Sequence, residues 1–526
     1  MKKSLFLLLI VIGNGAFSQD WPVKKLVEDK KGERIAFKQL PAFSFVTNKA
    51  MLRGGTYQEL KLNAGFIPQI VAEGPAALQL TIPLGNNEKM TFELVKYELG
   101  NVKFTQNNMD VIENVKIPLT YRGIIAGEPT KNTVVLTIND EDVSLIASFN
   151  DKAIQITKAN EKDRSSYRLY NSKKVQFPAA TIDCGTIGSL APEPVGAIQL
   201  NGVMQRPAAP QDKCINVFVD CFDSLYLWQN SDRQRTINYV YELYNTVATC
   251  FANEQISIEI AGINVWTTPD PYSGLNRDTA KADLSAYYKD NFYGNICVGL
   301  DYSSGGPRSG IASIGSVKGL APGVCPAYSV NNSPFAYCDL NYTTIAPGAN
   351  DFPVGPNTTG AAVYLVVHEM GHLLGSRHTH WCGWKLTSNP DTFGALDNCG
   401  PLEAKDAVTA VCSTVPPPPA TGGTIMSYCV GNATPNDFVS FNNGFGLLPG
   451  NAIRNFVDQT LCLPTCLRCL NLSNFRNKEH KLDADFNSSK LMEKSESSPT
   501  EQSRHYPNAL TNLVAVKPLS SSQNIR

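Results

Sequence analysis

The strongest structural signal in this chain is the run His368-Glu369-Met370-Gly371-His372-Leu373-Leu374-Gly375-Ser376-Arg377-His378. Helical residues four apart differ by only about 40° around the axis and about 6 Å along it, so His368 and His372 can bind one ion. Glu369 lies beside them, within reach of a water on that ion. Gly375 tolerates the left-handed backbone that ends a helix, so the chain can turn back and bring His378 to the ion. The fourth position stays open for water, as in catalytic zinc sites.

A second motif lies about fifty residues further along the chain. A bare H-E-x-x-H occurs by chance in many proteins, but here Gly375 and His378 follow it at the spacing of a three-histidine site. The downstream segment Gly422-Gly423-Thr424-Ile425-Met426-Ser427-Tyr428-Cys429 places a methionine in a tight turn, the second half of the metzincin signature. Together the two motifs predict a zinc site.

These motifs resemble those of the metzincin metalloproteases, and within them the reprolysin-like (adamalysin-type) branch in its secreted bacterial form. The resemblance covers residues 213–469. It implies an α/β (α+β) zincin catalytic domain with a central twisted sheet and a buried metal helix. It also implies one catalytic Zn²⁺ bound by His368, His372 and His378, with Glu369 as the general base and Met426 as the apolar floor beneath the metal.

Two positions differ from the animal and venom reprolysins. Thr379 stands where their third histidine is usually followed by Asp, and Tyr428 stands where they usually have Pro. The tyrosine spacing is similar to that of astacins and serralysins. Tyr428 is therefore a candidate to donate a hydrogen bond to the oxyanion, the alternative being a packed aromatic in the turn. His380 is expected outside the ligand set, because a fourth histidine would close the site.

The start of the chain has the pattern of a secretory signal peptide, residues 1–18. Lys2 and Lys3 precede an apolar run over 5–12 and then Ala16-Phe17-Ser18. The run is far shorter than the roughly 20 residues of a spanning helix, and no later segment is apolar enough to span. The near balance of 46 basic and 47 acidic residues gives no case for a nucleic-acid partner. We expect a secreted protein.

All fourteen cysteines lie between Cys184 and Cys469. In an exported chain they are expected to form disulfides rather than thiols. Cys382, Cys399, Cys412 and Cys429 surround the metal motifs, so we expect bridges among them to brace the loop from the third histidine to the methionine turn.

Residues 19–184 contain no cysteine before Cys184, the last residue of the segment. Short alternating apolar runs lie at 77–82, 90–95, 134–138 and 143–147. This period-two pattern predicts a mainly β domain. Its place before a protease-like domain suggests a prodomain that masks the active cleft. The alternative is an independent binding domain.

Residues 185–212 are rich in Pro, Ala and Gly and are predicted to be an exposed linker open to proteolysis. Cys184-Gly185 stands at its head. Reprolysin-like and matrix-type zymogens often use such a pair, whose thiolate occupies the fourth zinc position, so Cys184 is a candidate zymogen switch. The even number of cysteines favours the alternative that Cys184 forms a disulfide.

The predicted catalytic domain alternates strands with helices. We expect strands at 215–220, 256–266 and 296–300, helices at about 229–247 and 279–291, and the metal helix at about 358–374. Gly310-Ile311-Ala312 begins a short edge strand over 310–315. By the resemblance it borders the cleft and pairs with an extended peptide.

Residues 470–526 shift to Asn, Ser, Lys and Glu, which predicts a disordered tail. The segment from Tyr506 resembles the opening of a C-terminal sorting domain of bacterial type IX secretion, in a degenerate or shortened form. No pattern identifies a structural Ca²⁺ site.

The sequence thus predicts a secreted, zinc-dependent endopeptidase made as a latent precursor, with protein or peptide substrates. The first alternative is a secreted zinc hydrolase of a non-peptide substrate. The second is a binding protein stabilised by structural zinc, which would have no use for Glu369 beside its first ligand.

Overall fold

The computed structural model describes residues 21–50, 56–149, 152–159, 163–171, 183–186, 213–272, 276–302, 309–319, 332–340, 359–386, 393–405, 412, 415–417, 422–429, 439 and 441–464. All of them belong to a compact unit that spans residues 1–466. The expected signal peptide, linker residues 187–212 and the C-terminal tail lie outside the described residues. Within the described part of the chain, no helix combines the length and apolar character needed to cross a membrane.

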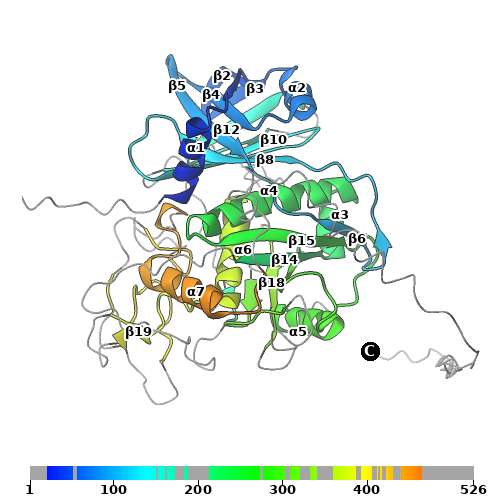
Figure 1. Cartoon of the computed structure of the whole chain (residues 1–526), viewed down its shortest axis with the longest axis vertical. Coiled ribbons are helices and arrows are strands. Elements are labelled where there is room, and N and C mark those ends of the chain that lie inside the picture. Colours follow the sequence, from blue (N-terminus) through cyan, green and yellow to red (C-terminus); the bar gives the residue numbers. More distant parts are fainter. Residues whose placement is uncertain are drawn as a thin grey trace, which may run out of the picture. The chain divides into compact units, whose positions relative to one another are not determined.

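The N-terminal region folds around a ten-stranded sheet with the order β1-β4-β5-β8-β9-β10-β11-β12-β3-β2 (Figure 1). Neighbouring strands are antiparallel except β1 and β4, which run parallel. The predicted alternation is confirmed on β4, where Leu78, Leu80 and Ile82 are buried while Gln79 and Thr81 are partly exposed. The elements are β1 (Lys38–Leu40), β2 (Phe43–Ala50), β3 (Thr56–Leu62), β4 (Ala77–Gly85), β5 (Glu88–Lys96), β8 (Leu119–Ile125), β9 (Asn132–Ile138), β10 (Val143–Phe149), β11 (Lys152–Lys158), β12 (Ser166–Asn171), α1 (Pro22–Gly32) and α2 (Phe66–Glu73).

A second sheet of eight strands has the order β13-β17-β18-β16-β14-β15-β6-β7. Its centre, from β15 to β18, is parallel, and β17 runs antiparallel to β18. The strands are β6 (Lys103–Gln106), β7 (Asp110–Val111), β13 (Asp183–Cys184), β14 (Cys214–Cys221), β15 (Ser257–Val265), β16 (Ile296–Asp301), β17 (Ser309–Ala312) and β18 (Phe335–Asp339). Every residue of β16 and β18 is buried, as expected for parallel strands covered on both faces.

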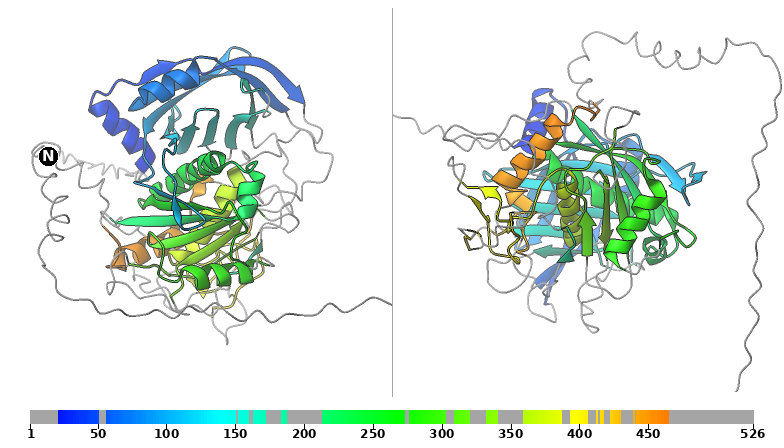
Figure 2. Two further views of the ribbon diagram at one scale, coloured as in Figure 1. Left: turned by 90° about the vertical axis from the view of Figure 1, so that its right-hand side faces the viewer. Right: turned by 90° about the horizontal axis from the view of Figure 1, so that it is seen from below.

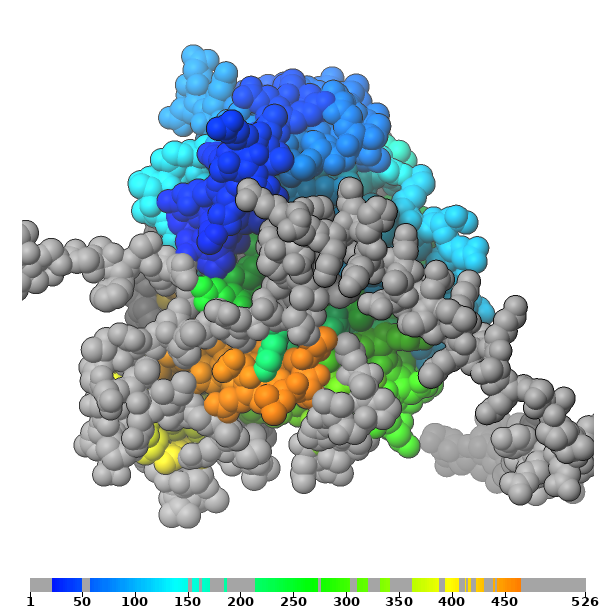
Figure 3. All heavy atoms as spheres, viewed as in Figure 1, coloured from blue at the N-terminus to red at the C-terminus, as the bar shows by residue number. Residues whose placement is uncertain are grey.

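Helices cover both faces of this sheet, as Figures 1 and 2 show. On one face lie α4 and α6, which pack against each other, and on the other lies α5. The side chain of Asp232 caps α4 by accepting a hydrogen bond from the Arg235 amide. The outer side of α7, drawn in orange, is visible in Figure 3. The bounds are α3 (Asp223–Trp228), α4 (Arg233–Ala252), α5 (Arg277–Tyr288), α6 (Thr359–Leu373), the 3₁₀ helix η3 (Phe441–Asn443), α7 (Leu447–Gln459) and a small sheet of β19 (Trp384–Lys385) and β20 (Phe393–Gly394).

The predicted strands and helices of the catalytic region are confirmed within a few residues, with one shortening. The edge strand ends at Ala312, so residues 313–315 of the expected strand lie outside it. Two strands of the second sheet, β6 and β7, come from residues 103–111 of the N-terminal region, which places part of this region inside the catalytic sheet.

The prediction that the cysteines form disulfides holds only in part. Bridges Cys382–Cys412 and Cys399–Cys429 brace the expected loop, and Cys214 and Cys462 are also disulfide-bonded. In contrast, Cys184, Cys221, Cys250, Cys297 and Cys338 are buried thiols.

The reason for the free thiols in the sheet is their register. Cys221 and Cys338 both lie opposite Leu300, on the two strands that flank β16. Strands two apart are separated by about 10 Å, beyond the roughly 7 Å limit for bridged Cα atoms. These cysteines therefore serve as small apolar core residues.

Candidate metal centre

The metal helix α6 is built from a continuous apolar run. Its residues from Ala362 onward are buried, which confirms the expectation of a buried rather than an amphipathic helix. It packs against α4 on one side and against β17 and β18 of the sheet. A support held on several sides positions metal ligands within fractions of an ångström.

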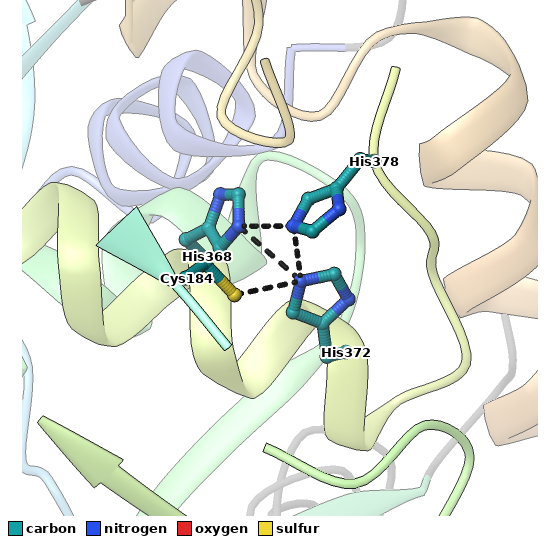
Figure 4. A group of neighbouring side chains, drawn as sticks. All are labelled: Cys184, His368, His372 and His378. Atoms are coloured by element: carbon teal, nitrogen blue, oxygen red, sulfur yellow. Dashed lines mark hydrogen bonds between the residues drawn. The ribbon is translucent and has the colours of Figure 1, made fainter. Parts of the chain in front are cut away.

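Three imidazoles converge at the end of this helix (Figure 4). The Nε2 atom of His372 lies 3.2 Å from that of His368 and 3.0 Å from that of His378, and the remaining pair is 3.1 Å apart. Gly375 has a φ of +92°, so the predicted left-handed turn after the helix is confirmed. This turn carries His378 back toward the two helical histidines.

Each imidazole is oriented by an acceptor at its other nitrogen. Nδ1 of His368 donates to the Ile425 carbonyl at 2.8 Å, and Nδ1 of His372 donates to the Ser376 carbonyl at 2.9 Å. Nδ1 of His378 lies 2.5 Å from a Glu403 carboxylate oxygen. Such bonds place the proton on Nδ1 and leave Nε2 free to bind a metal.

Burial favours the neutral form that metal binding needs. It lowers the pKa of His368 to about 3, and it also lowers the pKa values of His372 and His378. The three rings therefore present unprotonated Nε2 atoms to a common point at neutral pH.

The Cys184 thiol faces the same point (Figure 4). Cys184 lies opposite Gly310 in the parallel pairing of β13 with β17, and the Gly185 amide donates to the Gly310 carbonyl at 2.8 Å. Its Sγ lies 3.6 Å from His372 Nε2. The structure thus brings Cys184 to the three histidines as a free thiol, and the alternative of a disulfide at Cys184 is wrong.

These four donor atoms fit a tetrahedral zinc ion. They lie within 4.8 Å of one another. With ordinary bond lengths, a tetrahedral ion separates two nitrogen ligands by about 3.3 Å and a nitrogen from a sulfur by about 3.6 Å. The separations in this cluster are close to both values, and imidazole with thiolate is a donor set that zinc prefers.

The Glu369 carboxylate lies beside the cluster, against the edge strand. A Cβ on Gly310 would collide with this carboxylate, so the glycine of β17 makes room for it. Its second oxygen is 3.5 Å from the Thr186 hydroxyl. Burial raises the pKa of Glu369 to about 8, against the lowering effect of the Cys184 hydrogen bond and of the Arg277 and Lys281 charges.

The methionine turn packs against the metal helix at Gly371. Met426 is fully buried, and its sulfur would lie only 2.7 Å from a Cβ on Gly371. The turn is tied to the histidine loop because the Thr379 amide donates to the Met426 carbonyl at 3.0 Å. The Tyr428 ring centroid is 4.8 Å from that of His378, and its hydroxyl donates to the Cys184 carbonyl at 3.3 Å.

Glu403 is a site residue that the sequence did not indicate. Besides His378 it accepts from His380, whose Nε2 is 3.3 Å away, and the two imidazole rings stack with centroids 4.7 Å apart. Burial alone would raise the pKa of Glu403, but the hydrogen bonds from both histidines lower it to about 2. His380 is therefore a buried neighbour of the third histidine, outside the cluster. No sequence spacing links His378 or His380 to Glu403, so the sequence alone could not identify Glu403 as their partner.

The centre combines a buried helix carrying two histidines four residues apart, a third histidine after a glycine turn, and a methionine turn against the helix. This is the arrangement of a zincin-type metallopeptidase centre. Consistent with this, residues 211–440 match the family model of Metallo-peptidase family M12, in its reprolysin form. The match supports a reprolysin-like metallopeptidase of α/β zincin fold, acting on protein or peptide substrates. No curated protein matches the chain.

Proposed function

We propose that this protein is a secreted zinc endopeptidase, made as a latent precursor, in which Glu369 is the general base. The observation that carries the proposal is the convergence of His368, His372 and His378 on one point beside this carboxylate. The apolar N-terminus and the disulfides favour secretion, as in the secreted bacterial members that the motifs resemble.

Zinc bound by the three histidines would supply Lewis acidity, which polarises a scissile carbonyl and makes water a nucleophile near neutral pH. Glu369 takes the proton from the attacking water and passes it to the leaving amine. Strand β17 offers its main chain to an extended peptide, and Gly310 keeps the strand close to the carboxylate. Tyr428, at the rim of the centre, donates a hydrogen bond to the developing oxyanion.

Latency in this proposal comes from β13. This strand takes the place beside β17 that an extended substrate would take, and Cys184 occupies the fourth ligand position. Because β13 precedes the linker over 185–212, cleavage in that linker separates the switch from the catalytic domain that follows it.

The Cys184→Ala variant is expected to hydrolyse peptide without cleavage of the chain, because the fourth position then opens to water and the two-residue strand β13 loses the metal contact that would hold it beside β17. The full-length secreted precursor with zinc present is expected to be inactive. Cys250→Ala is the matched control, since Cys250 is also a buried free thiol but does not belong to the cluster. Peptide hydrolysis by the intact chains, with their length checked on a denaturing gel, provides the measurement.

If the Cys184→Ala chain stayed latent, steric masking by the N-terminal domain would replace the thiol as the cause. A substrate panel distinguishes the proposed endopeptidase from both rival functions. A panel of denatured proteins would be cut by an endopeptidase, left intact by a zinc hydrolase of non-peptide substrates, and left intact by a binding protein.

A further inference from the structure

We infer that the N-terminal domain, residues 21–171, stays bound to the catalytic domain after the linker is cut, so that the active enzyme is a two-chain complex. The inference rests on the proposed function only in taking linker cleavage as the activating event. Its basis is the hairpin β6–β7, which belongs to the N-terminal domain in sequence and to the catalytic sheet in space.

The hairpin completes an edge of the catalytic sheet. Strand β6 pairs with β15 from Lys103 opposite Gly262 to Gln106 opposite Val265. Just before it, the Ile260 amide donates to the Leu99 carbonyl at 2.6 Å, and just after it, the Asn107 amide donates to the Val265 carbonyl at 3.1 Å. Loss of the hairpin would leave β15 as an open edge strand, which proteins generally protect.

Side chains connect the hairpin to the catalytic interior. The Asn264 side chain is fully buried, and its Oδ1 accepts from the Thr105 hydroxyl at 3.1 Å and from the Asn108 amide at 2.7 Å. Its Nδ2 donates to Asp220 at 2.7 Å, in the centre of the catalytic domain. Without the hairpin, Asn264 Oδ1 would lose the Thr105 and Asn108 donors. A buried acceptor left without a hydrogen bond reduces the stability of the fold.

Apolar packing adds to these bonds. Phe104 of β6 belongs to the same hydrophobic core as α6, and its ring stacks on Tyr241 of α4 with centroids 6.4 Å apart. Leu99 is only 2% exposed and packs in that core as well. A Cβ on Gly100, whose φ is +124°, would approach the Ile260 carbonyl to 2.7 Å, so the chain lies directly against β15.

A second contact lies along the outer face of α4. The fully buried Asn245 donates through Nδ2 to the Leu136 carbonyl and to the Thr137 hydroxyl, both at 3.0 Å. Just past the end of the helix, its C-cap residue Asn253 donates to the Thr133 hydroxyl at 3.0 Å. The ten-stranded sheet thus provides hydrogen-bond partners for polar side chains of α4 and its C-cap. Without the sheet, these side chains would need water as their partner.

Among the residues that the structure describes, the inhibitory contact is confined to residues 183–186, whose partners include Gly310 and Ala312 of β17 and the Tyr428 hydroxyl. Strand β13 has two residues, and it pairs with β17 through Cys184 and its neighbour. Release of β13 from the cleft therefore breaks a local contact, whereas release of the N-terminal domain would remove a strand from the sheet and a cover from α4. Activation needs only the first of these events.

The test uses the full-length chain with the recognition sequence of a site-specific protease placed within residues 195–205. After cutting, native size-exclusion chromatography is followed by a denaturing gel. We expect the two fragments to co-elute in equal amounts and to separate only after denaturation. Elution of the N-terminal fragment apart from the catalytic fragment would overturn the inference. Because the readout is stoichiometry, it does not depend on whether the protein hydrolyses peptides.

Two variants identify the hairpin as the cause. Phe104→Ala is expected to weaken fragment association roughly a hundredfold or more, as the loss of a buried aromatic implies. Met109→Ala, on the same hairpin but 81% exposed, is the matched control and is expected to leave association unchanged. Thr105→Val, which removes only the hydroxyl donor to Asn264, serves if Phe104→Ala does not fold. Association unaffected by Phe104→Ala, or by Thr105→Val when that variant replaces it, would contradict the role given to β6.

Discussion

Glu369→Gln is expected to keep zinc bound while peptide hydrolysis falls by roughly 10²–10⁴-fold, the usual contribution of a general base. Zinc stays because the three imidazoles and their Nδ1 partners are unchanged. Hydrolysis falls because an amide cannot take a proton from the attacking water. The variant is best made together with Cys184→Ala, so that the fourth position is open in both the test protein and its reference.

Steady-state hydrolysis of a denatured protein, with zinc measured on the same samples, provides the data. Glu88→Gln is a suitable control, because Glu88 is exposed on the N-terminal sheet. Near-native turnover by Glu369→Gln would show that another group accepts the proton. Loss of zinc together with activity would instead mean that Glu369 supports the metal.

His378→Ala is expected to lose zinc and activity together, whereas His380→Ala keeps nearly all of its zinc. Removing His378 leaves two of three imidazoles, and binding through two ligands is much weaker. His380 is buried beside Glu403, and its Nε2 is directed to that carboxylate. Metal analysis of the two purified variants distinguishes them.

Glu403→Gln is the informative companion in this series. It removes the charge that orients His378 but keeps an acceptor oxygen, so zinc affinity should fall by roughly 10–100-fold. Equal zinc loss in His378→Ala and His380→Ala would show that the chain after Gly375 supplies its ligand differently.

The parts of this site that could be predicted from sequence are those set by local geometry. The spacing of His368 and His372 acts through helical periodicity, and Gly375 acts through its own backbone angle. The strands of the catalytic region that were predicted are short apolar runs between turn residues, a pattern typical of buried strands. Strand β18 (Phe335–Asp339) was missed because it is short and has no β-branched residue, unlike β16, which is also buried throughout.

Long-range pairing accounts for most of the remainder. Glu403 reaches His378 across a folded loop, and β6 joins β15 although about 160 residues separate them. The cysteine pattern indicated an oxidising compartment but not which thiols face one another, so the buried thiols of the parallel sheet were not foreseen. In each case the missing information was the neighbour in space.

In the proposed function, one zinc ion at His368, His372 and His378 drives peptide hydrolysis. The most direct measurement is a zinc titration of the Cys184→Ala protein after removal of metal by a chelator, with hydrolysis of a denatured protein as the readout. We expect no hydrolysis by the metal-free protein, and a return of activity in proportion to added zinc that is complete at one ion per chain. Hydrolysis that survives metal removal would contradict it.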